Sequence, residues 1–151
     1  MICIKDDILD FQDIKKLLAF TTHPFYTHDQ SRCRDLKPDY PIVEKLRKNV
    51  TKYNTEVAQI ITLPEGAAKN FHFDTARITT KLTSVTFLND DFIGGQPVVE
   101  GIEITPIIGR TYFFDGTKYS HAVLNVIKGD RHTLTMWYSD KKFSEVKDIY
   151  G

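Results

Sequence analysis

The chain has 151 residues, a length that fits one domain with its own hydrophobic core. Its 20 basic and 20 acidic residues cancel, so no overall field favours nucleic acid or an anionic membrane. Cys3 and Cys33 are too few for a disulfide framework and indicate free thiols in a reducing compartment. The sequence shows no signal peptide and no membrane span, so we expect a soluble, monomeric, cytoplasmic protein.

Two helices are predicted in the first third of the chain. Over Leu9–Phe20 the apolar residues fall near one stripe, and Asp10 stands early, where a helix N-terminus favours an acid. Over Pro41–Tyr53 apolar residues again recur at helical spacing, and a proline suits the first helical position. The segment between them, Thr21–Tyr40, has no clear period, so we expect a long loop that contacts a ligand.

The chain changes character after residue 55. Short runs rich in Val, Ile, Thr, Phe and Tyr alternate with turn signals such as Gly94-Gly95. Many short strands in one region are typical of a sandwich or jelly roll. We therefore predict an all-β core with N-terminal helices, α+β by content. It would form one domain over 1–151, with helical support in 1–55 and a jelly-roll core in 56–140.

A candidate metal site begins with His72 and Asp74. Residues two apart on a strand share a face, so this imidazole and carboxylate would project together. His121 lies in another strand-like run, and two histidines with one carboxylate make the facial triad of non-haem Fe(II) oxygenases. The structural alternatives are a surface His–Asp pair and an ordinary core histidine.

A candidate anion site lies on the predicted strand that follows Gly129. Alternation places Arg131, Thr133, Thr135 and Trp137 on one face. A guanidinium fork matches a carboxylate in a bidentate way and stays charged when buried. An internal Arg–Asp pair or an outward-facing arginine remains the alternative.

The order of these residues resembles the prolyl-4-hydroxylase-like 2-oxoglutarate/Fe(II) dioxygenases over residues 58–139. The resemblance includes the ten-residue step from His121 to Arg131. The intervening motifs that carry it are Phe87–Asp90, Gly94-Gly95, Pro106-x-x-Gly109 and Phe113-Phe114.

The resemblance implies a double-stranded β-helix, that is, a cupin-like jelly roll, and a defined set of cofactors. These are Fe(II), 2-oxoglutarate as co-substrate and O2, with ascorbate as a candidate reductant. It assigns the metal ligands to His72, Asp74 and His121. Arg131 would bind the distal carboxylate of 2-oxoglutarate and Thr135 would add a hydroxyl group.

Three further positions would line the cofactor pocket, namely Phe87, Val123 and Trp137, although plain core packing is the alternative reading for Val123 and Trp137. Relatives commonly carry a tyrosine that touches 2-oxoglutarate at the place of Phe87 or in the strand before the His-x-Asp motif. Here neither Phe87 nor the stretch Gln59–Leu63 supplies one, and Thr135 is the candidate replacement.

The nearest resemblance is to enzymes that hydroxylate prolyl residues in proteins or peptides, with release of succinate and CO2. The candidate substrate surface is the Thr21–Tyr40 segment, with Phe25, Tyr26, Arg32 and Arg34, although a merely solvated loop is the alternative. No nucleic acid and no membrane are expected as partners. Three other histidines, His23, His28 and His132, are interpreted as structural or solvent-facing.

Two other functions remain open. An AlkB-type nucleic-acid demethylase shares the His-x-Asp and distal histidine pattern but carries a second arginine where this chain has Trp137, and it usually needs a basic groove. A jelly-roll binding module with a vestigial site is disfavoured by the complete triad, because an unneeded polar cluster costs stability.

Overall fold

The computed structural model describes residues 1–22, 26–75 and 77–141. Two α-helices, one 3-10 helix and thirteen strands follow one another along these residues. In chain order they are β1 (Cys3–Asp6), α1 (Phe11–Leu18), η1 (Ala19–Thr22), β2 (Tyr26–His28), β3 (Ser31–Leu36), α2 (Pro41–Val50), β4 (Asn54–Leu63), β5 (Lys69–His72), β6 (Leu82–Phe87), β7 (Ile93–Gly94), β8 (Pro97–Val99), β9 (Ile102–Glu103), β10 (Arg110–Phe114), β11 (His121–Val123), β12 (Val126–Lys128) and β13 (Arg131–Ser139).

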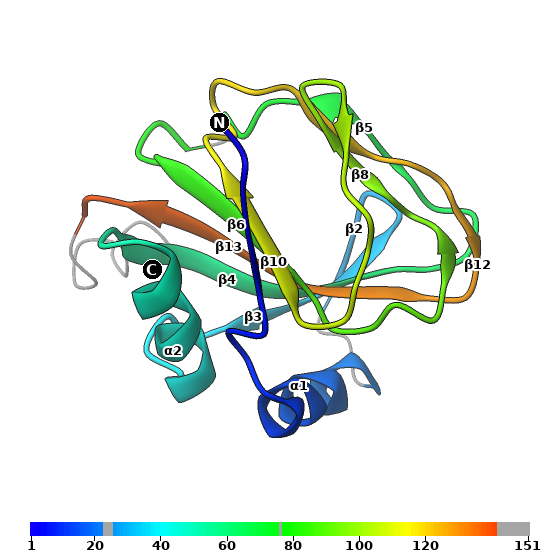
Figure 1. Ribbon diagram of the computed structural model, residues 1–151, viewed down its shortest axis with the longest axis horizontal. Helices are drawn as coiled ribbons and strands as arrows, with labels where there is room; N and C mark the ends of the chain where they lie inside the picture. Colours follow the sequence, from blue (N-terminus) through cyan, green and yellow to red (C-terminus); the bar gives the residue numbers. More distant parts are fainter. Residues whose placement is uncertain (23–25, 76, 142–151) are drawn as a thin grey trace.

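The strands form two principal antiparallel sheets (Figure 1). The larger has seven strands in the order β1-β10-β6-β13-β4-β3-β2, and the smaller has four in the order β5-β11-β8-β9. A short β12-β7 pair completes the fold. β1 to β4 all belong to the larger sheet, and from β4 to β13 the chain crosses repeatedly between that sheet and the other strands, which agrees with the predicted jelly roll with its N-terminal helices.

Both predicted helices are present and lie on one side of the seven-stranded sheet (Figure 1). Asp10 caps α1 by accepting a hydrogen bond from the Asp13 backbone N–H, and the Asp10 N–H in turn donates to Asp13 Oδ2. The buried stripes of α1 and α2 pack with β4 and β13 in one core, to which Leu17, Leu46 and Met136 contribute. This core supports the central strands from outside, so it stabilises the sheet without filling the space between the sheets.

The expected loop over Thr21–Tyr40 is wrong for most of its length. β2 and β3 form a hairpin there, and β3 pairs with β4 at the edge of the larger sheet. Asp29 and Gln30 form its two-residue turn with φ of 40° and 61°, the positive values such a turn requires. Consequently residues 1–55 supply strands as well as helices. The predicted positions His23 and Phe25 lie outside the described residues.

The inward positions of the hairpin explain why its strand pattern was missed. Ser31 and Cys33 are buried on β3, whereas Arg32 and Arg34 alternate with them. Serine and cysteine do not mark an apolar face as valine or isoleucine would, so the two-residue period is hidden.

A second core lies between the sheets, around Phe87, Val99 and Phe114. It fills only part of the space there and leaves a cavity beside it. Among the helices of the described residues, none has the length and apolar character needed to cross a bilayer.

Candidate active site

A cavity of about 640 Å³ opens between the two sheets. Its walls come from β4, β6, β10 and β13 of the larger sheet and from β5, β8 and β11 of the smaller one. Side chains of the β2–β3 hairpin close another side, so the segment predicted to contact a ligand does border the cavity. The cavity is within the usual size range of small-molecule sites.

The predicted triad converges at this cavity. His72 at the end of β5 and His121 at the start of β11 are directly paired across the smaller sheet, and Asp74 follows β5. Asp74 Oδ1 lies 3.1 Å from His121 Nε2 and 3.7 Å from His72 Nε2. The three ligand atoms lie within 4.8 Å of one another. Neighbouring ligands of an octahedral metal with bonds of about 2.1 Å are separated by about 3 Å, so the cluster has the dimensions of a metal site.

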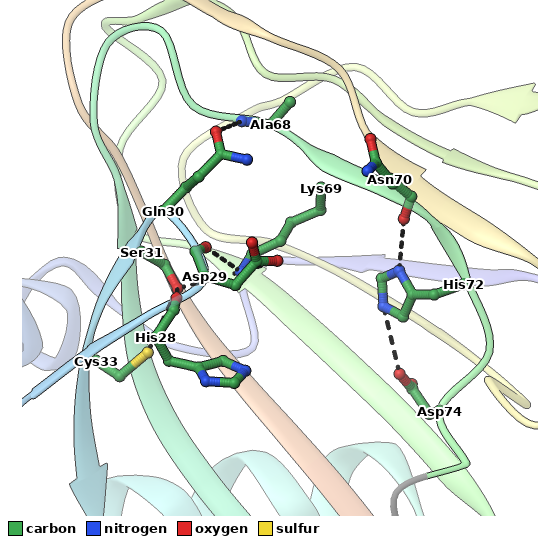
Figure 2. Close-up of polar contacts among 10 residues, drawn as sticks. All are labelled: His28, Asp29, Gln30, Ser31, Cys33, Ala68, Lys69, Asn70, His72 and Asp74. Atoms are coloured by element: carbon green, nitrogen blue, oxygen red, sulfur yellow. Dashed lines mark hydrogen bonds and ion pairs between the residues drawn. The ribbon is translucent and has the colours of Figure 1, made fainter.

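Hydrogen bonds orient both imidazoles. His72 Nδ1 lies 2.7 Å from the Asn70 carbonyl oxygen, and His121 Nδ1 lies 2.9 Å from that of Tyr119 (Figure 2 shows the His72 contact). A carbonyl only accepts, so each Nδ1 carries the proton and donates it. In the neutral ring, Nε2 then turns a lone pair toward Asp74, so either a proton or a metal cation must lie between the two atoms.

Asp74 is held in place from the side away from the histidines. Its Oδ2 accepts a hydrogen bond from Thr83 Oγ1 at 2.7 Å, and its backbone N–H donates to the Gly116 carbonyl. Burial alone would raise the pKa of Asp74, but the hydrogen bond with His121 and the charge of that ring hold the pKa below its ordinary value. The carboxylate is therefore ionised and ready to bind a cation at neutral pH.

Arg131 is an almost fully buried cation, with 3% of its surface exposed. Its Nε donates to the Gly95 carbonyl at 2.9 Å, and the guanidinium lies over the Phe87 ring. Nη2 is buried without a hydrogen-bond partner among the described residues. Burial lowers the pKa of Arg131, and the nearby Tyr112 phenol partly offsets this. A buried, unpartnered guanidinium nitrogen beside a cavity is the feature that a bound carboxylate would satisfy.

Tyr112 is a cavity residue that the sequence did not predict. It lies on β10, is 3% exposed and lines the cavity near Arg131. Burial raises its pKa to about 12, so it stays a phenol that donates a hydrogen bond. Tyr112 and Phe114 are two residues apart on β10, so both side chains point into the cavity. This spacing is the only local sign of where Tyr112 points, because Arg131 is distant from it in the sequence.

Most of the predicted pocket residues line the cavity. Thr133, Thr135 and Trp137 share its wall with Arg131, and Val123 lies on the opposite sheet. Phe87 is fully buried and packs against Arg131 and Tyr112, and it is not among the residues lining the cavity. It therefore shapes the site from behind.

The remaining histidines point in different directions. His132 lies outside the cavity wall, as alternation predicts, with Nδ1 2.7 Å from Thr62 Oγ1. Burial lowers the pKa of His132. His28 is solvent-exposed as expected, but it also borders the cavity, because the hairpin brings it there.

A clasp joins the hairpin turn to β5 (Figure 2). Lys69 Nζ donates to the Asp29 carbonyl at 2.7 Å, to Asp29 Oδ2 at 3.3 Å and to Ser31 Oγ at 3.2 Å. The Ala68 N–H donates to Gln30 Oε1 at 3.3 Å. Since β5 also carries His72, the clasp fixes the hairpin relative to the metal-site strand.

Comparisons with known proteins agree with this geometry. The model of the 2OG-Fe(II) oxygenase superfamily matches residues 58–139, more than half of the chain. No curated protein sequence matches the chain significantly. The chain therefore belongs to the 2OG-Fe(II) oxygenase superfamily, a class of non-haem iron dioxygenases that use 2-oxoglutarate.

Several solved structures share the fold. A Pseudomonas putida prolyl-4-hydroxylase is 16% identical, with 93% of each chain covered and a TM-score of 0.76. The viral collagen prolyl hydroxylase of Paramecium Bursaria Chlorella virus-1, in complex with 2-oxoglutarate, is 19% identical, with 93% of this chain and 96% of that chain covered and a TM-score of 0.77. A Trichoplax adhaerens prolyl hydroxylase, solved with a hypoxia inducible factor peptide fragment, is 15% identical, with 99% and 87% covered and a TM-score of 0.70.

Proposed function

We propose that this dioxygenase hydroxylates a prolyl residue in a protein or peptide. One oxygen atom of O2 enters a prolyl C–H bond as a hydroxyl group, and the other enters the new carboxylate of succinate. 2-Oxoglutarate loses CO2 and supplies two electrons, and the C–H bond supplies the other two. The observation that carries the proposal is a single cavity that holds both the His72–Asp74–His121 cluster and the unpartnered Arg131 nitrogen.

The metal ligands in this proposal are His72, Asp74 and His121. Their donor set of two imidazoles and one carboxylate fits Fe(II), and three protein ligands leave three octahedral positions open. When bound, iron supplies the activation of O2 that no side chain can supply. The chain's own part is to present Nε2 of each histidine, to keep Asp74 ionised and to exclude bulk water with the walls of the cavity.

Arg131 binds the distal carboxylate of 2-oxoglutarate in this proposal. The free Nη2 supplies a charge-assisted hydrogen bond, and Tyr112 supplies a phenol from the neighbouring wall. Tyr112 thus provides the hydroxyl group that Phe87 lacks. Thr135 also lines the cavity, with Oγ1 3.3 Å from Thr133 Oγ1, and remains the second hydroxyl candidate.

The prolyl substrate is supported by the fold. Three of the similar structures are prolyl hydroxylases, one of them with a bound peptide. The demethylase alternative has Trp137 where a second arginine is needed, and the chain carries no net positive charge. The vestigial alternative does not account for a complete triad whose imidazoles and carboxylate are each oriented by further hydrogen bonds.

The test is incubation with a panel of proline-containing peptides, Fe(II), 2-oxoglutarate and ascorbate as reductant, under ¹⁸O2. Mass spectrometry should show one labelled oxygen atom on a prolyl residue and an equal amount of succinate. Asp74→Ala should abolish both, and Asp140→Ala, an exposed carboxylate outside the site, should abolish neither. Succinate formation with no labelled proline in any peptide would overturn the prolyl assignment.

A further inference from the structure

A second depression adjoins the active-site cavity. The two share the side chains of Thr75, Arg77 and Thr80, which lie in the segment that follows Asp74. Tyr53 and Lys118 also line this depression. The surface next to the candidate metal ligands is therefore continuous with a second concave region outside the cavity.

Exposed apolar side chains line the cavity and the depression. Phe71 is 62% exposed and Phe73 48% exposed, and both line the cavity. Ile78 is 98% exposed and lines the depression. Large apolar groups gathered around a concave site mark a surface that binds another chain, because each leaves water when that chain is bound.

The depression also concentrates positive charge. Arg77, Lys81 and Lys118 line it, whereas Asp115 is the only acidic residue among the described residues that line it. Asp115 accepts hydrogen bonds from the Thr117 backbone and hydroxyl group, and its ion pair with Lys118 is long, at 4.0 Å. The Lys118 side chain is 77% exposed. Since the whole chain has no net charge, this excess is a local feature.

We infer that the depression binds the part of a peptide substrate that flanks the reacting residue, and that it selects acidic side chains there. An extended peptide advances about 3.3 Å per residue, so a few residues carry it from the cavity mouth into the depression. Lys81 and Lys118 pair with glutamate or aspartate on one side of the target residue, while Phe71 and Phe73 contact the peptide nearer the mouth. This inference rests on the proposed peptide substrate and specifies its chemistry.

The experiment uses two peptides with the same central proline sequence and flanking residues of opposite charge, glutamate in one and lysine in the other. Binding of each fluorescently labelled peptide is measured by anisotropy on the protein loaded with Fe(II) and 2-oxoglutarate without O2. The glutamate peptide should bind about fivefold more tightly, the size expected for one or two exposed ion pairs. Raising the salt concentration should reduce the difference.

The double variant Lys81→Glu/Lys118→Glu should reverse the preference. Lys15→Glu/Lys16→Glu makes the same charge change on the exposed face of α1 and should leave the preference intact. Equal binding of both peptides, or a preference that the Lys81/Lys118 variant does not change, would overturn the inference.

Hydroxylation of the same peptides separates this result from the proposed function. If both are hydroxylated equally well, the inference fails and the prolyl hydroxylase activity stands. If neither gains oxygen while 2-oxoglutarate is consumed, the proposed peptide substrate fails and the inference fails with it.

Discussion

Gly116 leaves no room for a side chain, because a Cβ there would lie 2.2 Å from Asp74 Oδ2 and 2.9 Å from Thr83 Oγ1. We predict that Gly116→Ala moves the carboxylate and weakens Fe(II) binding by about 10- to 100-fold, as loss of a supporting contact does in other metal sites. Calorimetric metal titration measures the effect. Gly101→Ala is the control, because its φ of 77° strains the backbone locally but its Cβ would meet nothing within 4 Å, and equal affinity in both variants would contradict the account.

His132 should make stability depend on pH through its lowered pKa. Burial is the main cause, so the folded protein binds the proton less readily than the unfolded chain, whose value is about 6.5. The contribution of His132 to the free energy of unfolding is therefore fully present above about pH 6.5 and is lost as the pH falls toward the folded-state pKa. Urea unfolding at pH 7.5 and 5.5 should show a smaller loss of stability in His132→Gln than in wild type. An equal loss of stability in both proteins would show that His132 does not cause the pH dependence.

Local spacing predicts some site residues and cannot predict others. His72 and Asp74 are two apart, and Arg131, Thr135 and Trp137 alternate on one strand, so strand geometry alone places each set on one face. Thr83, Tyr112 and Gly116 reach the site from other segments by tertiary packing. No local sequence pattern predicts that these three residues lie beside the site.

At the scale of elements, the clasp between β5 and the β2–β3 hairpin should hold the hairpin rigidly in place as one wall of the cavity. Lys69→Met removes three hydrogen bonds to the hairpin, two to Asp29 in its turn and one to the buried Ser31 on β3. We predict faster amide hydrogen exchange over 26–36, with the β4–β13 pairing unchanged, and a loss of about 1 kcal/mol in unfolding free energy.

Lys128→Met is the matched control, because Lys128 is exposed on β12. Exchange in the hairpin that is as slow in Lys69→Met as in Lys128→Met would show that pairing with β4 alone holds the hairpin. The hairpin is also the element that sequence reasoning missed. Its inward positions are Ser31 and Cys33, whereas the correctly predicted helices carry apolar stripes of leucine, isoleucine and valine.

At the scale of the whole molecule, the core beneath the helices and the core between the sheets have different structural roles. The helices and the outer face of the larger sheet form a core that does not reach the cavity. The candidate ligands lie on the smaller sheet and the segment after β5, and Arg131 lies on the larger one. Fe(II) and 2-oxoglutarate together would therefore connect the sheets. The jelly roll itself follows from the short strands and the motif order, which sequence reasoning predicted.

Ligand-induced stabilisation should follow from this connection. Ligands that bind only the folded state raise its stability by about 2.7 kcal/mol at 100 times their dissociation constant. We predict that Fe(II) with 2-oxoglutarate raises the melting temperature more than either alone, and that a chelator removes the increase. Differential scanning fluorimetry measures this. A melting temperature unaffected by both ligands would indicate that the cavity does not bind them.

The most direct test of the central claim is an anaerobic titration of the protein with Fe(II) and 2-oxoglutarate. The visible charge-transfer band of iron chelated by a 2-oxo acid reports metal and co-substrate together. We predict that the band forms in the wild type, is lost in His72→Ala, and needs roughly 10- to 100-fold more 2-oxoglutarate in Arg131→Ala, which loses a charged hydrogen bond. A folded wild-type protein that gives no band would contradict the assignment of the site.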